Sequence, residues 1–269
     1  MDTSKATISV SDLEKLLADP SKLKVLDCST QMGREAGDCP RIEFLKSHIP
    51  GAIFLDLDNL KDQKSDLPYM MPSEAQFIGA MKCHGIKLSD TVVCYDGGPT
   101  QFFGYRAAWM MKTMGHPSVF VLDGGFPAWK KEGKKVEATD ASACNDDFAY
   151  KQNPDKIKNF DQIQEWVSNT DSFQLLDARG PPMFEKGNIP GSTNVPFSKF
   201  VNMENKTMKS AEDRTAAASE SGIDLTKPIV VSCQGGIAAT CLFGALSDIH
   251  KSDLALYDGS FAEYSKKAN

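Results

Sequence analysis

The sequence has 269 residues, of which 41% are hydrophobic, and its 30 Lys and Arg against 36 Asp and Glu give a formal net charge of -6. This length suits two compact domains of about 130 residues better than one. The acidic balance supplies no extended basic surface and no apolar run is long enough to cross a bilayer, so we expect neither nucleic acid nor a membrane as a partner.

Helices and strands alternate along the first half. The opening residues indicate a helix capped by Ser11, and a Pro50-Gly51 turn leads into an apolar run typical of a buried strand. In chain order, the predicted elements are a helix up to residue 18, strands at 25–28 and 52–55, a helix from 73, a strand at 91–95, a helix at 103–114 and a strand at 119–122.

The second half repeats the pattern of the first. The matched segments are 25–29 and 175–179, 48–52 and 188–192, 92–98 and 230–236, and 121–126 and 255–261. Four matches in the same order indicate an internal duplication. We therefore predict an α/β fold with two domains, each a mainly parallel sheet flanked by helices on both faces. The predicted boundaries are 1–133 for the N-terminal domain, 134–158 for a polar linker and 159–269 for the C-terminal domain.

Cysteine usage indicates the compartment. The chain has seven cysteines, an odd number, with no CxxC pair and no cationic-apolar signal segment ahead of them. We therefore expect a reducing, cytoplasmic environment. A mitochondrial location is the alternative if a presequence precedes this sequence.

One cysteine stands where an apolar run meets a glycine-containing loop. The run 229–232 ends at Cys233, and a helix is predicted over 238–248. Taken alone, such a cysteine is usually a small buried hydrophobe. Backbone N–H groups of the loop and of the helix N-terminus favour a thiolate, however, so we interpret Cys233 as a nucleophile that carries its cargo as an anion. The candidate cradle for that anion consists of Gln234, Gly235, Gly236, Ile237 and Ala238.

The first half lacks a thiol at the matching position. Gapless alignment puts Tyr95 opposite Cys233, and a shift of one residue puts Asp96 there. We therefore expect only the C-terminal domain to be catalytic.

Together, these motifs resemble those of the tandem-domain rhodaneses, the thiosulfate and 3-mercaptopyruvate sulfurtransferases. The resemblance extends over nearly the whole chain and rests on residues 47–52, 122–126 with Trp129, 176–179, 188–197, the Cys233 loop and 257–260. It implies a non-catalytic N-terminal domain and a persulfide on Cys233 that passes its sulfur to cyanide, a thiol, thioredoxin or a sulfur-relay protein. It also implies that neither a metal nor an organic cofactor is needed.

The loop after Cys233 bears on the sulfur donor. Family members that prefer thiosulfate usually have basic residues there, and those that prefer 3-mercaptopyruvate have a small Gly-Ser-Gly type of loop. Here the loop has no positive charge. A dianion would lose charged hydrogen bonds that each contribute on the order of 1.5 to 3 kcal/mol. We therefore expect 3-mercaptopyruvate, with thiosulfate as the alternative, although Gly235 stands where the mercaptopyruvate pattern has a serine.

Four further residues receive roles from the resemblance. Arg179 matches the arginine that holds the donor's carboxylate or sulfonate, for which a guanidinium is suited. His48 matches the family histidine, Asp38 is a plausible but unaligned acid partner, and Asp177 is expected to accept loop hydrogen bonds. The structural alternatives are a surface ion pair for Arg179 and a loop histidine bonded to the backbone for His48.

Two other functions share part of this pattern. A dual-specificity phosphatase needs an arginine six residues after its cysteine, where this chain has Ala239, so a phosphate dianion would lack charge compensation. A non-catalytic rhodanese-like binding module remains open, because Gln234 and Gly235 both depart from the family pattern.

Overall fold

The computed structural model describes residues 2, 5–99, 102–139 and 151–268. The chain forms two compact units, the first made of Met1–Gln63 and Met71–Gln152 and the second of Lys64–Met70 and Asn153–Asn269. The short segment Lys64–Met70 therefore belongs to the second unit although it lies in the first half of the sequence. Residues 140–150 of the predicted linker lie outside the described residues, and the predicted domain boundaries stay a prediction.

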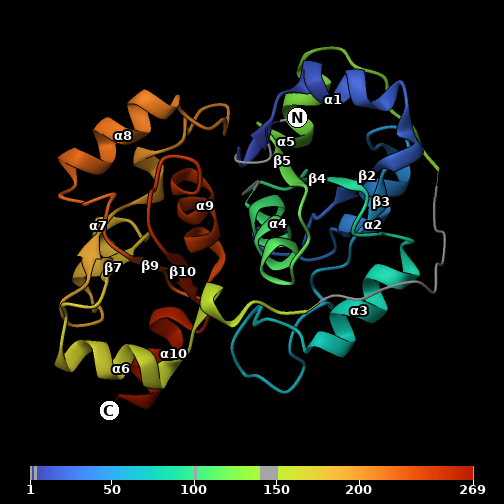
Figure 1. Ribbon diagram of the computed structural model, residues 1–269. Coiled ribbons are helices and arrows are strands. Elements are labelled where there is room, and N and C mark those ends of the chain that lie inside the picture. The colour runs from blue at the N-terminus through green and yellow to red at the C-terminus, as the bar shows by residue number, and fades with distance from the viewer. Residues whose placement is uncertain (1, 3–4, 100–101, 140–150, 269) are drawn as a thin grey trace. The chain divides into compact units, whose positions relative to one another are not determined.

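Each unit contains a five-stranded sheet. The strands of the first unit are β1 (Thr7–Ile8), β2 (Leu23–Asp27), β3 (Ile53–Phe54), β4 (Thr91–Tyr95) and β5 (Val119–Leu122). Those of the second are β6 (Ile157–Lys158), β7 (Gln174–Asp177), β8 (Thr193–Asn194), β9 (Ile229–Ser232) and β10 (Leu254–Tyr257). The strand orders β1-β5-β4-β2-β3 and β6-β10-β9-β7-β8 correspond one to one, and the described pairs are parallel. This topology confirms the predicted α/β fold and the duplication (Figure 1).

Helices connect the strands in both units. Those of the first unit are α1 (Val10–Leu17), α2 (Pro40–Lys46), α3 (Glu74–Cys83), α4 (Phe103–Thr113) and α5 (Gly125–Lys131). Those of the second are α6 (Phe160–Ser168), α7 (Pro181–Glu185), α8 (Ala211–Glu220), α9 (Ile237–Leu246) and α10 (Ser260–Lys267). Across the described ranges, no helix has the length and apolar character that a membrane span requires.

The cap of α1 differs from the prediction. Ser9, not Ser11, precedes the helix, and its Oγ accepts a hydrogen bond from Asp12 N at 3.1 Å. The reason is the edge strand β1, which ends at Ile8 and brings the chain into the helix two residues earlier than the predicted cap allows.

The sheet of the second unit has a helical layer on each face. Ile163 and Trp166 of α6 form a buried cluster with Val230 and Tyr257 of the central strands, and Phe261 of α10 packs against it. Helix α9 packs against β9 and β10 from the other side (Figure 1). Strand β9 is therefore buried on both faces, which explains its uninterrupted apolar sequence.

The strand registers settle which residue corresponds to Cys233. The last residue of β2 pairs with Tyr95, and the last residue of β7 pairs with Ser232. The residues that follow these two positions are Asp96 and Cys233. The shifted alignment is therefore the structural one, and an aspartate occupies the cysteine position in the first unit.

Candidate functional site

Cys233 directly follows the carboxyl end of β9, the edge at which parallel α/β sheets bind ligands. Cys233 is buried, with an exposed fraction of 2%. Four positions later α9 begins at Ile237, with Gly236 as its N-cap in the left-handed region at φ 80°. A glycine adopts that conformation without the strain that a side chain would add. The sulfur therefore lies in a tight turn that leads straight into a helix N-terminus.

Helix α10 holds the backbone of this turn in place. Phe261 N donates to Cys233 O at 3.0 Å, and Ala262 N donates to Gln234 O at 2.9 Å. Cys233 N donates to Ser260 Oγ at 3.1 Å, and Ser260 has a left-handed φ of 52°. A non-glycine residue rarely adopts such a φ, so this local strain marks a position that the surrounding contacts fix. With the two carbonyls tied to α10, the loop has a defined orientation around the sulfur.

Several backbone N–H groups after Cys233 have no acceptor among the described residues. Within the described part of the chain, the backbone N–H groups of Gln234, Gly235, Ile237 and Ala238 make no hydrogen bond. Free N–H groups are expected in the first turn of a helix, where they carry the positive end of the helix dipole. Here they follow a buried cysteine, so the loop has the donors that an anionic sulfur group needs.

Arg179 lies in a buried ion pair with Asp177. Its Nε donates to both carboxylate oxygens at 3.0 Å, and its Nη2 donates to Oδ2 at 2.7 Å. The two side chains are 3% and 0% exposed, and the ring of Phe261 lies 4.3 Å from the guanidinium carbon. Asp177 also accepts from the backbone N–H of Arg179 at 3.0 Å. The surface ion pair considered for Arg179 is therefore a buried one in the structure.

The arginine also reaches the cysteine loop and its support. Its Nη1 donates to Gln234 Oε1 at 3.1 Å, and its Nη2 donates to Gly187 O at 2.8 Å. The Asp177–Arg179 pair thus connects the end of β7 with the residue directly after Cys233.

Gly235 faces a residue from the distant segment Lys64–Met70. A Cβ at position 235 would lie 3.3 Å from Cγ of Pro68, which is closer than ordinary van der Waals contact. Pro68 therefore supplies a physical reason for glycine where the mercaptopyruvate pattern has a serine. Neither Pro68 nor the role of Ser260 as an acceptor was predicted. Ser260 at least belonged to a matched motif, whereas nothing in the sequence pointed to Pro68.

His48 and Asp38 lie in the first unit. His48 is 0% exposed, and its Nδ1 lies 2.7 Å from Phe44 O and its Nε2 3.4 Å from Thr139 Oγ1. A carbonyl only accepts, so Nδ1 carries the proton. This is the backbone-bonded arrangement named as the alternative for His48. Asp38 is exposed, and the structure records no hydrogen bond between the two side chains.

Asp96 fills the equivalent turn of the first unit with its own carboxylate. Its Oδ1 accepts from Gly98 N at 2.6 Å, and its Oδ2 accepts from Phe103 N, the first residue of α4, at 3.2 Å. Burial raises the pKa of Asp96 to about 6, and these two N–H donors oppose that rise. In this unit, which has no thiol at the turn, the backbone N–H groups of the turn therefore bind the Asp96 carboxylate.

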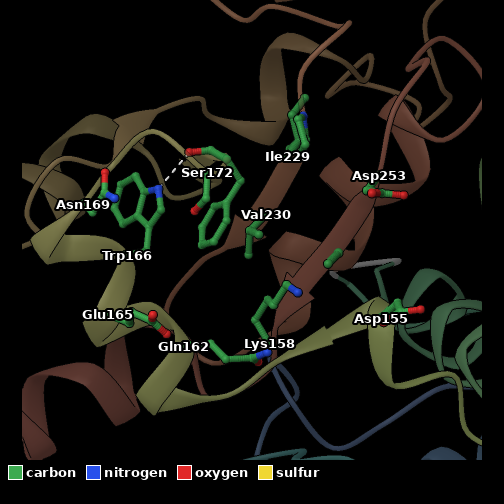
Figure 2. Close-up of a pocket in the computed structure, with 13 residues that line it drawn as sticks. Asp155, Lys158, Gln162, Glu165, Trp166, Asn169, Ser172, Ile229, Val230 and Asp253 are labelled. Atoms are coloured by element: carbon green, nitrogen blue, oxygen red, sulfur yellow. Dashed lines mark hydrogen bonds between the residues drawn. The ribbon is translucent and has the colours of Figure 1, made fainter.

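A separate cavity of about 660 Å³ lies at the opposite end of the second sheet (Figure 2). Ile229 and Val230, which begin β9, line it, whereas Cys233 follows the other end of that strand. Ala255, the second residue of β10, also lines it. The cavity therefore lies apart from the thiol.

Comparisons with known proteins agree with this geometry. The model of the rhodanese-like domain matches residues 9–132 and 159–267. A mitochondrial thiosulfate/3-mercaptopyruvate sulfurtransferase of Arabidopsis thaliana is 33% identical over 98% of this chain and 77% of its own. A thiosulfate sulfurtransferase of Gallus gallus is 36% identical over 91% of this chain and 87% of its own. A 3-mercaptopyruvate sulfurtransferase of Rattus norvegicus is 33% identical over 98% and 93%.

Solved structures show the same fold. SseA from Escherichia coli, described with the rhodanese fold of 3-mercaptopyruvate sulfotransferases, superposes with a TM-score of 0.86 at 28% identity, over 96% of this chain and 99% of its own. Tum1 from Saccharomyces cerevisiae superposes with a TM-score of 0.87 at 26% identity, over 99% and 96%. The chain therefore belongs to the rhodanese family and carries two rhodanese-like domains in tandem.

Proposed function

We propose that this protein is a sulfurtransferase that moves sulfane sulfur from 3-mercaptopyruvate to a thiol or cyanide acceptor through a persulfide on Cys233. One observation carries the proposal. A buried cysteine is followed by four backbone N–H groups that have no partner within the described residues. The names of the relatives from Arabidopsis thaliana and Rattus norvegicus support the same chemistry.

Two displacements at sulfur describe the reaction. The Cys233 thiolate attacks the sulfur of 3-mercaptopyruvate, the new S–S bond forms, and the C–S bond breaks with its electron pair leaving on the enolate of pyruvate. The persulfide S–H is available to protonate that enolate, which yields pyruvate and the persulfide anion. An acceptor thiolate or cyanide then attacks the outer sulfur, and the Cys233 thiolate leaves. No external oxidant or reductant is needed, and no loop serine is required for the proton.

The loop stabilises the anion that accumulates between these steps. Each N–H bond to a charged group contributes about 1.5 to 3 kcal/mol, and here the donors are fixed before the charge arrives. We propose Gln234, Gly235, Gly236, Ile237 and Ala238 as this cradle. Arg179, held by Asp177, contacts this cradle through Gln234. His48 stays a proposed donor-binding residue, with Asp38 in a supporting role.

The preferred donor follows from charge. From Cys233 to Ala238 the loop has no cationic side chain, so it offers no counter-charge to a dianion such as thiosulfate. Thiosulfate remains the alternative donor, in line with the name of the Gallus gallus relative. A non-catalytic binding module is the remaining alternative.

We propose a thiol as the physiological acceptor and a reducing compartment as the location. Thioredoxin or a sulfur-relay protein could supply the accepting thiol in a reducing cytosol. The mitochondrion is the alternative compartment, consistent with the Arabidopsis thaliana relative. Fractionation of the tagged protein from its own cells would decide between the two.

Parallel steady-state assays with the two donors and cyanide as acceptor test the function. We expect kcat/KM for 3-mercaptopyruvate to exceed that for thiosulfate. A higher value for thiosulfate would overturn the donor preference. The absence of turnover with both donors would favour the binding module.

A further inference from the structure

The guanidinium of Arg179 has little capacity left for a substrate. Its Nε and one Nη2 hydrogen are directed at Asp177, the second Nη2 hydrogen at Gly187 O and one Nη1 hydrogen at Gln234 Oε1. Four of its five N–H donors are therefore used. The side chain is 3% exposed, and the ring of Phe261 lies against it at 4.3 Å. Bidentate capture of a donor carboxylate would require breaking this arrangement.

The contact with Arg179 fixes the orientation of the Gln234 amide. A guanidinium only donates hydrogen bonds, so the atom of Gln234 that faces it must be the oxygen. The Nε2 amine then lies at the other end of the amide with two N–H donors. Gln234 is exposed, and within the described part of the chain this amine donates to no acceptor. The residue directly after Cys233 thus presents an oriented, uncharged donor.

We propose that the Gln234 amide recognises the anionic end of the sulfur donor, with Arg179 acting as the positioning residue that fixes it. The ligand class is a thiol-bearing acid with a single carboxylate beside a carbonyl, two acceptors that suit a neutral pair of N–H donors. This inference rests on the proposed sulfurtransferase function. It assigns donor recognition to a residue that replaces the loop cation, and it gives Arg179 an indirect role.

Substitutions at Gln234 separate its oxygen from its amine. In Gln234→Glu, the carboxylate still accepts from Arg179, but the two N–H donors are replaced by negative charge. We expect KM for 3-mercaptopyruvate to rise about 10- to 100-fold with kcat within about threefold, the pattern for lost uniform binding. Gln234→Met keeps the length without donor or charge and should raise KM about tenfold. Gln164→Glu, an exposed change of equal charge on α6, is the matched control and should leave KM unchanged.

A double-mutant cycle tests the positioning role. Arg179→Lys keeps the charge but loses the fork that holds Asp177 and Gln234 together. If Arg179 acts through Gln234, Arg179→Lys raises KM in the wild-type background and has little further effect in Gln234→Met. Circular dichroism of each variant shows whether it is folded. Equal effects of Arg179→Lys in both backgrounds would mean that the arginine binds the donor itself and would overturn its positioning role.

Sulfur loading of Cys233, measured by intact mass, separates a failure of the proposed sulfurtransferase function from a failure of the proposed donor recognition by Gln234. If the wild-type protein takes sulfur from 3-mercaptopyruvate, and Gln234→Glu and Gln234→Met have the same KM as the wild type, donor recognition by Gln234 is wrong while the proposed function stands. A wild-type protein that takes sulfur from neither donor would overturn the proposed function and this inference together.

Discussion

The turns at Cys233 and Asp96 occupy equivalent positions in the two units but differ in what accepts hydrogen bonds from their backbone N–H groups. Each follows the end of a central strand, and in each the carbonyl of the key residue accepts a hydrogen bond from a phenylalanine N–H, Phe261 in one unit and Phe126 in the other. In the first unit, the Asp96 carboxylate occupies the N–H donors of its turn. In the second unit, the corresponding N–H groups of Gly235 and Ile237 make no hydrogen bond among the described residues. The same turn therefore offers N–H donors in both units, and under the proposed function only the unit with the thiol carries sulfur.

The two turns also differ in length and support. Helix α4 begins seven residues after Asp96 (103 minus 96), whereas α9 begins four residues after Cys233 (237 minus 233). In the second unit, the Asp177–Arg179 pair contacts the turn through Gln234. In the first unit, Ser29 stands at the position of the arginine, and its backbone N–H donates to the Asp27 carboxylate. A thiol in the first unit would therefore lack both the short turn and an equivalent of the Asp177–Arg179 pair.

Exchanging the thiol between the units should have the largest effect. Cys233→Ser is expected to lower kcat/KM by at least about 1,000-fold, because the nucleophile is lost. Cys83→Ser, at an exposed cysteine of α3, is the control and should keep full activity. The double variant Asp96→Cys with Cys233→Ser should stay inactive. Recovery of turnover in that variant would contradict the view that turn length and support matter.

Removal of the buried aspartates should affect the two units unequally. Asp177→Ala leaves the Arg179 guanidinium buried without its carboxylate and should lower the free energy of unfolding by about 3 to 5 kcal/mol. Asp27→Ala removes the acceptor of the Ser29 N–H. Because the residue at position 29 is a serine and not an arginine, we expect a smaller decrease in the free energy of unfolding, about 1 to 2 kcal/mol.

Urea denaturation followed by circular dichroism measures both values. Asp155→Ala, at an exposed carboxylate of the second unit, is the control and should change the free energy by less than about 0.5 kcal/mol. Equal losses for Asp177→Ala and Asp27→Ala would contradict the proposed asymmetry.

Asp96 should give the first unit a pH dependence. Burial raises its pKa from 3.8 to about 6, so the folded protein holds this proton to a higher pH than the unfolded chain does. The stability that this group contributes is present below pH 3.8 and is lost as the pH rises through about 6, with a total change of about 3 kcal/mol. Burial also raises the pKa of Asp27, which acts in the same direction.

Asp96→Asn removes this titration. The free energy of unfolding, measured at about pH 4 and about pH 7.5, should fall less with rising pH in the variant than in the wild type. The same pH dependence in both proteins would show that the Asp96 carboxyl does not titrate differently on folding.

The smallest expected effect concerns the contact between Gly235 and Pro68. Gly235→Ala places a Cβ 3.3 Å from the proline ring and should destabilise the second unit by about 1 kcal/mol. Pro68→Ala in the same chain should relieve most of this loss, measured as a double-mutant cycle of unfolding free energies. Additive effects of the two changes would mean that the residues do not press on each other.

Continuous apolar runs bounded by turn residues made the fold predictable. Strands 91–95 and 119–122 were predicted at the residues where β4 and β5 lie, because buried parallel strands carry no polar interruption. The duplication then supplied the second sheet. Which residue matches Cys233 stayed open because the two turns differ in length, and only the strand registers settle it.

The candidate site could be predicted from the sequence only where its residues are neighbours along the chain. Cys233 and its loop are contiguous, so their pattern was readable. Three features depend on side chains that folding brings together. They are the use of most Arg179 N–H donors within the protein, the contact of Gly235 with Pro68 and the buried position of His48. No spacing rule contains that information.

The central claim is that Cys233 carries the sulfur. Incubating the protein with 3-mercaptopyruvate and measuring its intact mass, followed by peptide mapping, tests this directly. We predict the addition of one sulfur atom, located on Cys233 and absent in Cys233→Ser. A protein that gains no sulfur, or gains it on another cysteine, would contradict the account.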